Sequence, residues 1–344
     1  MMVSKSAVAA AILAAVATTS SVSQVQAQTV LRFNNVLPPT HIIRTQGWDV
    51  WAKQVAEATS GRVKIQFTTK ALGILPRAFD LARDGVADVG WGVQGYTPGR
   101  FVSAEIVEIP FLSATGEALS VAYWRVYKAH FEKAKEYKGV HLLGVHTHSA
   151  GHVFTATKPL VKMADLRGLK IRIVNRATSQ ILRSYGGAPV REPAPKLSQL
   201  LSKGVVDGSF FTADGISSFR LGGKLNNWLR FKKGLYNTSF FLVINQAKWN
   251  KIPAADQAAI TRVSGENFAR IMGSLWDRSE AMGAKLLKTK GAKIADPSAA
   301  DMAKLNTMAA GFEKAWIAKA SKKGIDADAS LKMLRAEVAG YKSK

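Results

Sequence analysis

The stretch that decides the fold is Ala164–Asp214, ADLRGLKIRIVNRATSQILRSYGGAPVREPAPKLSQLLSKGVVDGSFFTAD. It contains a short apolar strand, LKIRIV, followed by a helical segment, a break at Gly186-Gly187 and a second helical segment that ends at KGVVDG. Strands that alternate with helices in this way indicate a mostly parallel sheet covered by helices.

Arg172 stands at the centre of the LKIRIV strand, where an apolar side chain is the ordinary choice. Its guanidinium cannot be neutralised, and a buried charge without a partner is costly. Two interpretations follow: an internal salt bridge to an Asp or Glu, or a carboxylate-binding arginine in a cleft, because its planar fork matches a carboxylate.

The same alternation extends along the chain, which holds more residues than one hydrophobic core usually accommodates. We therefore expect two domains, with ligands bound at the carboxyl ends of the strands. The expected strands are 30–36, 63–67, 86–90, 140–145, 154–157, 169–174, 189–190, 206–207, 235–244 and 293–295. The longer expected helices are 45–60, 116–136 and 254–290, the last with possible bends at Gly265, Gly273 and Gly283.

Four motifs in a fixed order resemble the substrate-binding proteins of tripartite ATP-independent periplasmic (TRAP) transporters. They are LRFNNVLPPTH (31–41) with W-x3-V-x3-TSGRV (51–63), ADVGWGVQGYTPGRFVSAEIVEIPF (87–111), DLRGLKIR (165–172) and VDG (206–208). The resemblance covers nearly the whole chain that follows the N-terminal segment.

The resemblance implies a two-lobed α/β clamshell, each lobe a mostly parallel sheet flanked by helices, with a long helix at about 254–290 bracing both. Lobe I would comprise 28–150 and about 239–270, and lobe II 151–238 and about 271–344. The implied function is capture of an organic acid and its delivery to integral membrane subunits driven by an ion gradient. Arg172 would bind the carboxylate.

The sequence departs from the family pattern at two places. Counting back from Thr157-Lys158-Pro159, His152 stands where an arginine is common, and Phe211 stands where an asparagine usually follows VDG. Losing a cation and a polar contact while gaining an aromatic face favours an aromatic or apolar monocarboxylate. The alternative is that the phenylalanines only fill the core. The expected ligand-binding residues are Arg172, Phe211, His152, His148, Trp91, Phe210, Asn175 and Phe240.

His146, His148 and His152 form an H-x-H-x3-H cluster, which supports a rival hypothesis of a metal-dependent periplasmic hydrolase. No carboxylate lies nearby in sequence to support such a metal site, so hydrogen bonding to a ligand is the preferred interpretation. The G-x-S-x-G, P-loop and H-E-x-x-H patterns do not occur. We expect no enzyme activity, no cofactor and no metal.

The N-terminal segment and the composition point to export. Residues 1–27 have the features of a signal peptide: Lys5, an apolar run at 7–17 and a small-x-small site at 25–27, with a mature start at Gln28 in the periplasm. The chain has no cysteine, which excludes disulfides and thiol chemistry. Its net charge is +24, but the basic residues are dispersed and no nucleic-acid motif appears, so we expect no nucleic-acid binding. We also expect a monomer.

Overall fold

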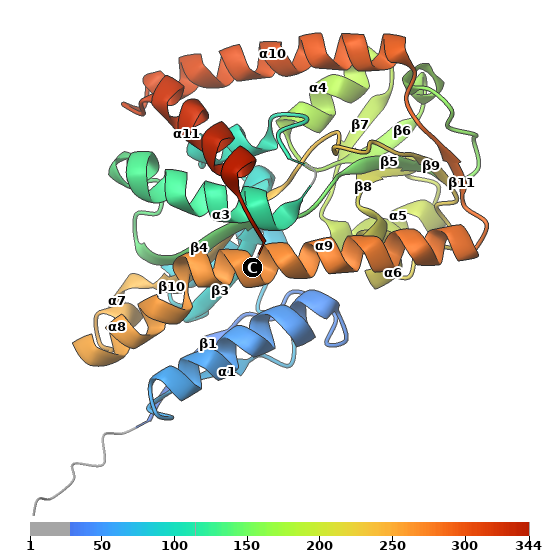
Figure 1. Cartoon of the computed structure of the whole chain (residues 1–344). Helices are drawn as coiled ribbons and strands as arrows, with labels where there is room; N and C mark the ends of the chain where they lie inside the picture. Colours follow the sequence, from blue (N-terminus) through green and yellow to red (C-terminus); the bar gives the residue numbers. More distant parts are fainter. Residues whose placement is uncertain (1–27, 114, 344) are drawn as a thin grey trace, which may run out of the picture.

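The computed structural model describes residues 28–113 and 115–343, so the expected signal peptide lies outside the described residues. These residues form two sheets with helices packed on their faces (Figure 1). The first sheet has the order β2-β1-β3-β10-β4 and the second β11-β9-β5-β8-β6-β7. The strands of the first are β1 (Thr29–Phe33), β2 (Val63–Phe67), β3 (Val89–Val93), β4 (Val140–Thr147) and β10 (Ser239–Asn245). Those of the second are β5 (His152–Thr155), β6 (Lys170–Ile173), β7 (Ala188–Arg191), β8 (Gly208–Phe211), β9 (Asn227–Leu229) and β11 (Lys293–Ala295).

One strand in each sheet runs against all the others, so the expectation of two mostly parallel sheets is confirmed. β10 is antiparallel to β3 and β4, and β5 is antiparallel to β8 and β9. The chain crosses between the sheets three times, from β4 to β5, from β9 to β10 and from β10 to β11. The first two crossings enter the antiparallel strands, so they meet the carboxyl ends of the parallel strands in the region between the sheets.

The α-helices are mostly short, except for three near the C-terminal end of the described chain. They are α1 (Asp49–Ala58), α2 (Ala78–Arg83), α3 (Gly116–Val126), α4 (Arg176–Ser184), α5 (Leu197–Ser202), α6 (Ala213–Ser218), α7 (Gln246–Trp249), α8 (Ala254–Val263), α9 (Gly265–Thr289), α10 (Ala299–Ser321) and α11 (Ala327–Gly340). None of the helices in the described part of the chain combines the length and apolarity needed to cross a bilayer.

Two expected helices have different limits in the structure. The helix expected at 116–136 ends as an α-helix at Val126 and continues through π and 3-10 turns to Ala134. The one expected at 254–290 is two helices, because Ser264 is extended and Gly265 has a φ of 55°. α9 then continues without interruption through Gly273 and Gly283, so these two glycines do not break the helix.

Those two glycines instead allow α9 to approach both halves of the molecule. A Cβ on Gly273 would lie 2.5 Å from the Cα of Glu117 in α3, and one on Gly283 would lie 2.4 Å from the carbonyl oxygen of Ala213 in α6. α3 begins before β4 of the first sheet, and α6 directly follows β8 of the second. The long helix thus packs closely against elements of both sheets (Figure 1).

Two carboxylates of α9 reinforce this bracing. Asp277 accepts hydrogen bonds from the backbone N–H groups of Gly116 (2.6 Å) and Glu117 (2.9 Å) at the start of α3. Glu280 accepts from those of Ala213 (3.1 Å) and Asp214 (3.0 Å) at the start of α6. Carboxylates at helix N-termini satisfy unpaired donors and complement the helix dipole.

Candidate functional site

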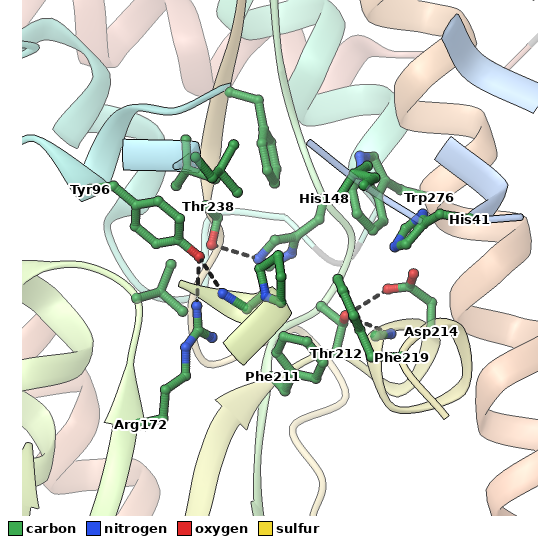
Figure 2. A pocket seen from close by; sticks show the side chains of 18 of the residues that line it. His41, Tyr96, His148, Arg172, Phe211, Thr212, Asp214, Phe219, Thr238 and Trp276 are labelled. Carbon is green, nitrogen blue, oxygen red and sulfur yellow. Dashed lines mark hydrogen bonds between the residues drawn. The ribbon is translucent and has the colours of Figure 1, made fainter. Parts of the chain in front are cut away.

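A cavity lies between the two sheets. Its wall is formed by residues at or after the carboxyl ends of β1, β3, β4, β6 and β8, by α6, by α9, and by the start of β10 with the segment before it. Ligand sites in open α/β sheets lie at such strand ends. The lining is mostly apolar and aromatic, with a few polar side chains at two ends (Figure 2).

Arg172 forms one end of the cavity and is 1% exposed. Its guanidinium donates to the carbonyl oxygens of Glu192 (2.8 Å) and Phe210 (3.2 Å) and to the hydroxyl of Tyr96 (2.7 Å). No ion pair between described residues involves it. The internal salt bridge considered from sequence is therefore not formed, and two of the five guanidinium donors have no partner in the described part of the protein.

Tyr96 connects the two halves at this end. It follows β3 of the first sheet, and its hydroxyl oxygen accepts from Arg172 on β6 and from the backbone N–H of Ala194 (3.0 Å), both in the second half. With two hydrogen bonds accepted, its own O–H proton is still free to be donated. Figure 2 shows the Tyr96 hydroxyl and the Arg172 guanidinium directed at one another beside the cavity.

Stacked aromatic rings form the wall contributed by the first sheet and α9. The ring of Phe240 lies between those of Trp91 (centroids 4.9 Å apart, 15°) and Trp276 (5.6 Å, 20°). Phe211 contributes from the second sheet, with its ring centroid 5.5 Å from the guanidinium carbon of Arg172. Trp91, Phe240 and Phe211, all expected from the sequence, are thus part of the cavity lining. Such faces favour a flat apolar or aromatic ligand.

The three clustered histidines lie in different surroundings. His148 lines the cavity, donating from Nδ1 to the carbonyl of Ser149 (2.6 Å) and accepting at Nε2 from Thr238 (2.8 Å). His146 lies behind the aromatic wall and accepts from the indole N–H of Trp91 (2.9 Å). Burial lowers the pKa of His146 to about 3 and that of His148 to about 4, so both rings are neutral. No group of three or more His, Asp or Glu side chains in the described residues is arranged to hold a metal ion.

His152, Phe210 and Asn175 are not in the cavity lining, although the sequence analysis expected them there. His152 binds Glu280 through Nε2 (3.2 Å) and accepts from the N–H of Phe231 (3.2 Å). Phe210 is fully buried beside Tyr236, because neighbouring strand residues face opposite sides of the sheet and Phe211 faces the cavity. Asn175 caps α4 by accepting from Thr178.

Sequence reasoning missed the polar residues at the other end of the cavity, His41 and Asp214, and also the ring of Trp276. His41 closes the LPPTH motif and Asp214 closes the opening stretch, so both lay within segments that the sequence analysis had singled out. Neither segment showed that the two side chains line one cavity, because 173 positions separate them in the chain.

Burial also shifts the pKa values of His41 and Asp214. It lowers the pKa of His41 to about 4. The pKa of Asp214 is raised to about 8, first by burial and then by the nearby charge of Glu280. At neutral pH His41 is therefore neutral and Asp214 is largely protonated. Arg172 is the cationic residue of this lining.

Two sheets are joined by three crossings, and the cavity between them ends in an arginine that has no ion-pair partner among the described residues. These features define a two-lobed ligand-binding protein. Residues 33–319 match the family described as bacterial extracellular solute-binding protein, family 7. The chain belongs to this family of TRAP solute-binding proteins, as its motifs indicated.

Solved structures of similar proteins agree with this assignment. A TRAP periplasmic solute-binding protein from Bordetella bronchiseptica, solved with (R)- and (S)-mandelate, is 34% identical with a TM-score of 0.88; the match covers 90% of this chain and 99% of that one. A marine metagenome TRAP protein specific for aromatic acid ligands, solved with 3-hydroxybenzoate, is 30% identical with a TM-score of 0.84, covering 92% and 100%. The outer membrane transporter protein TsaT of Comamonas testosteroni is 28% identical over 321 residues, 92% of this chain and 94% of TsaT.

Proposed function

We propose that this protein captures an aromatic monocarboxylate between its two sheets and delivers it to the membrane subunits of a TRAP transporter. The observation that carries the proposal is the buried, unpaired guanidinium of Arg172 at one end of an aromatic-walled cavity. An anion placed there would gain charge-assisted hydrogen bonds and relieve the cost of a buried lone charge.

The ligand carboxylate is expected to accept from the two free donors of Arg172 and from the O–H of Tyr96. Its ring would then lie against Phe211 and the stacked wall of Trp91, Phe240 and Trp276. A second carboxylate would be desolvated among these rings with no further cation to receive it. Mandelate and 3-hydroxybenzoate, the ligands in the two similar structures, are both aromatic monocarboxylates.

The proposal also includes where the protein is located in the cell and how it acts. We place the protein in the periplasm after removal of residues 1–27, and it acts by binding and release, without catalysis. The expected hydrolase activity of the rival hypothesis has no support in the arrangement of His146, His148 and His152, whose rings are engaged at three separate places.

Isothermal titration calorimetry on protein refolded from denaturant, to remove any copurified ligand, tests the proposal. Benzoate, phenylacetate and mandelate should bind more tightly than succinate, malate or sialic acid. Benzamide, which keeps the shape of benzoate without its charge, is the matched control and should bind at least about 30-fold more weakly. A C4-dicarboxylate as the tightest ligand, or equal binding of benzamide and benzoate, would contradict the proposal.

A further inference from the structure

The end of the cavity away from Arg172 contains polar atoms that no described residue satisfies. Figure 2 shows His41, Asp214 and Trp276 on this side, across the pocket from Arg172. The Oδ2 atom of Asp214 and the indole N–H of Trp276 are buried and have no hydrogen-bond partner. Unpaired buried polar atoms are rare in proteins and require an explanation.

Asp214 is not needed to begin its helix. The first N–H groups of α6 are already bound, those of Ala213 and Asp214 by Glu280 and that of Gly215 by the Thr212 hydroxyl (3.2 Å). The Asp214 side chain accepts one hydrogen bond, from the Thr212 hydroxyl to Oδ1 (2.6 Å). The second oxygen, Oδ2, accepts none of these bonds. Asp214 lines the cavity and is only 1% exposed. Helix capping therefore does not account for a buried carboxyl group here.

His41 presents a donor at the same end. Its Nδ1 accepts from the backbone N–H of Ile43 (3.2 Å), which leaves the proton of the neutral ring on Nε2. The ring is held edge-on against Phe219, with centroids 5.0 Å apart. No described residue accepts a hydrogen bond from Nε2, and His41 is 3% exposed within the cavity lining.

We infer that His41 and Asp214 bind a hydroxyl group on the ring or side chain of the aromatic acid, so that the protein selects hydroxylated aromatic monocarboxylates. This inference rests on the proposed function, because it assumes that the carboxylate occupies the Arg172 end. The Oδ2 atom of Asp214 and the Nε2–H of His41 are the two partners. The indole N–H of Trp276 is a third group available to the same hydroxyl.

A hydroxyl is the group that fits this combination of partners. His41 and Trp276 can only donate, whereas Asp214 offers an oxygen that accepts when ionised and an O–H that donates when protonated. A hydroxyl both donates and accepts, so it can pair with either form. A carboxylate cannot donate a hydrogen bond, and it would bring a negative charge close to Glu280 and Asp214. An ammonium group cannot accept a hydrogen bond from His41.

Calorimetry with matched pairs of acids tests the inference. Each pair is an unsubstituted acid and its hydroxylated forms: benzoate with 3- and 4-hydroxybenzoate, and phenylacetate with 3- and 4-hydroxyphenylacetate. In the wild-type protein at least one hydroxylated acid should bind about tenfold or more tightly than its parent, since a site with buried polar groups rejects an analogue that leaves them unpaired.

Asp214→Leu should bring the affinities for the two members of that pair to within about threefold of each other. Asp214→Ala, which removes the carboxyl group altogether, serves if the leucine variant does not fold, and it should reduce the preference. Asp277→Asn is the matched control. It alters a half-buried carboxylate of α9 that caps α3 and does not line the cavity, so the preference should persist.

The outcomes separate this inference from the proposed function. If the parent acids bind but no hydroxylated form binds more tightly, or if Asp214→Leu weakens both members of a pair equally, the hydroxyl site is refuted and the proposed function stands. If no acid of either kind binds the folded wild-type protein, the proposed function fails and the inference fails with it. A preference that Asp214→Leu abolishes and Asp277→Asn retains supports both.

Discussion

Replacing Arg172 by methionine removes the charge that we assign to the ligand carboxylate while keeping an unbranched side chain in β6. In the wild-type protein Arg172 is 1% exposed and has no carboxylate partner among the described residues. The ligand would supply that partner. In the variant the incoming carboxylate would be desolvated at an apolar end of the cavity, without the fork that receives it.

The expected loss follows from measurements on buried charge pairs. Truncating one partner of such a pair costs about 2–5 kcal/mol of binding free energy. At about 1.4 kcal/mol per decade, this is roughly a 30-fold to 4,000-fold increase in Kd for benzoate or mandelate. Arg172→Lys should fall between the wild type and the methionine variant, because an ammonium keeps the charge but not the planar set of donors.

Calorimetry gives Kd directly, and thermal unfolding gives an independent measure. Ligand at 100 times the wild-type Kd should stabilise the wild-type protein by about 2.7 kcal/mol. The same concentration should stabilise a variant with 1,000-fold weaker binding by less than about 0.1 kcal/mol. The free variant should still unfold cooperatively, since Arg172 joins no ion pair that its loss would break.

Arg125→Met is the control for removing an arginine. Arg125 pairs with Glu266 (2.8 Å) and with Glu337 of α11 (2.6 Å), it is about one-third exposed, and it does not line the cavity. Its loss should lower stability slightly and leave Kd unchanged. Binding of the aromatic acid by Arg172→Met within threefold of the wild-type value would refute the assignment of Arg172.

Three further predictions concern closure, the aromatic wall and pH. Small-angle scattering should give a smaller radius of gyration with a saturating aromatic acid than without, because clamshell proteins close around their ligands; an unchanged profile would contradict hinge closure. Phe211→Asn should weaken aromatic acids by about threefold to tenfold and change acetate binding little, because a ring contact is worth about 0.5–1.5 kcal/mol; equal effects on both would count against stacking. The pKa of Asp214 is raised from 3.8 to about 8, so the folded protein holds a proton that the unfolded chain releases, and the contribution of Asp214 to the free energy of unfolding should fall as pH rises from about 4 to about 8. Asp214→Asn should remove this part of the pH dependence in urea unfolding, and parallel curves for the two proteins would contradict the raised pKa.

Much of the fold was predictable because local patterns are strong in this chain. The strands expected at 63–67 and 293–295 have those limits in the structure, and the apolar strand around Arg172 was evident from its neighbours. The break between α8 and α9 falls at Gly265, one of the three glycines named from the sequence as possible bends, whereas Gly273 and Gly283 lie within the continuous α9. The end of α3 at Val126 was not predictable from periodicity, because apolar residues continue past it and tertiary packing decides where the helical hydrogen bonds end.

The site was predictable where a single residue breaks a local rule, as Arg172 does. It was not predictable where the decisive partner is distant in sequence. His152 has its partner, Glu280, 128 residues away, so sequence alone could not show that its ring is turned from the cavity. The choice between Phe210 and Phe211 depends on which face of β8 meets the first sheet, and a one-residue shift of strand register would reverse it.

The division of the site between the two sheets gives a physical reason for closure on a ligand. Arg172 and Phe211 belong to the second sheet, whereas Trp91 and Phe240 belong to the first. We expect a carboxylate held by Arg172 to gain the stacked wall when the sheets approach, and the hydrogen bond from Arg172 to Tyr96 joins the two halves beside it. A ligand shifts a conformational equilibrium by its differential affinity for the two states. An aromatic acid, which can engage both sides, should therefore favour the closed state, whereas acetate, which engages only Arg172, should bind without closing the molecule. Scattering profiles with saturating benzoate and saturating acetate would distinguish these cases, and equal compaction by the two acids would refute the argument.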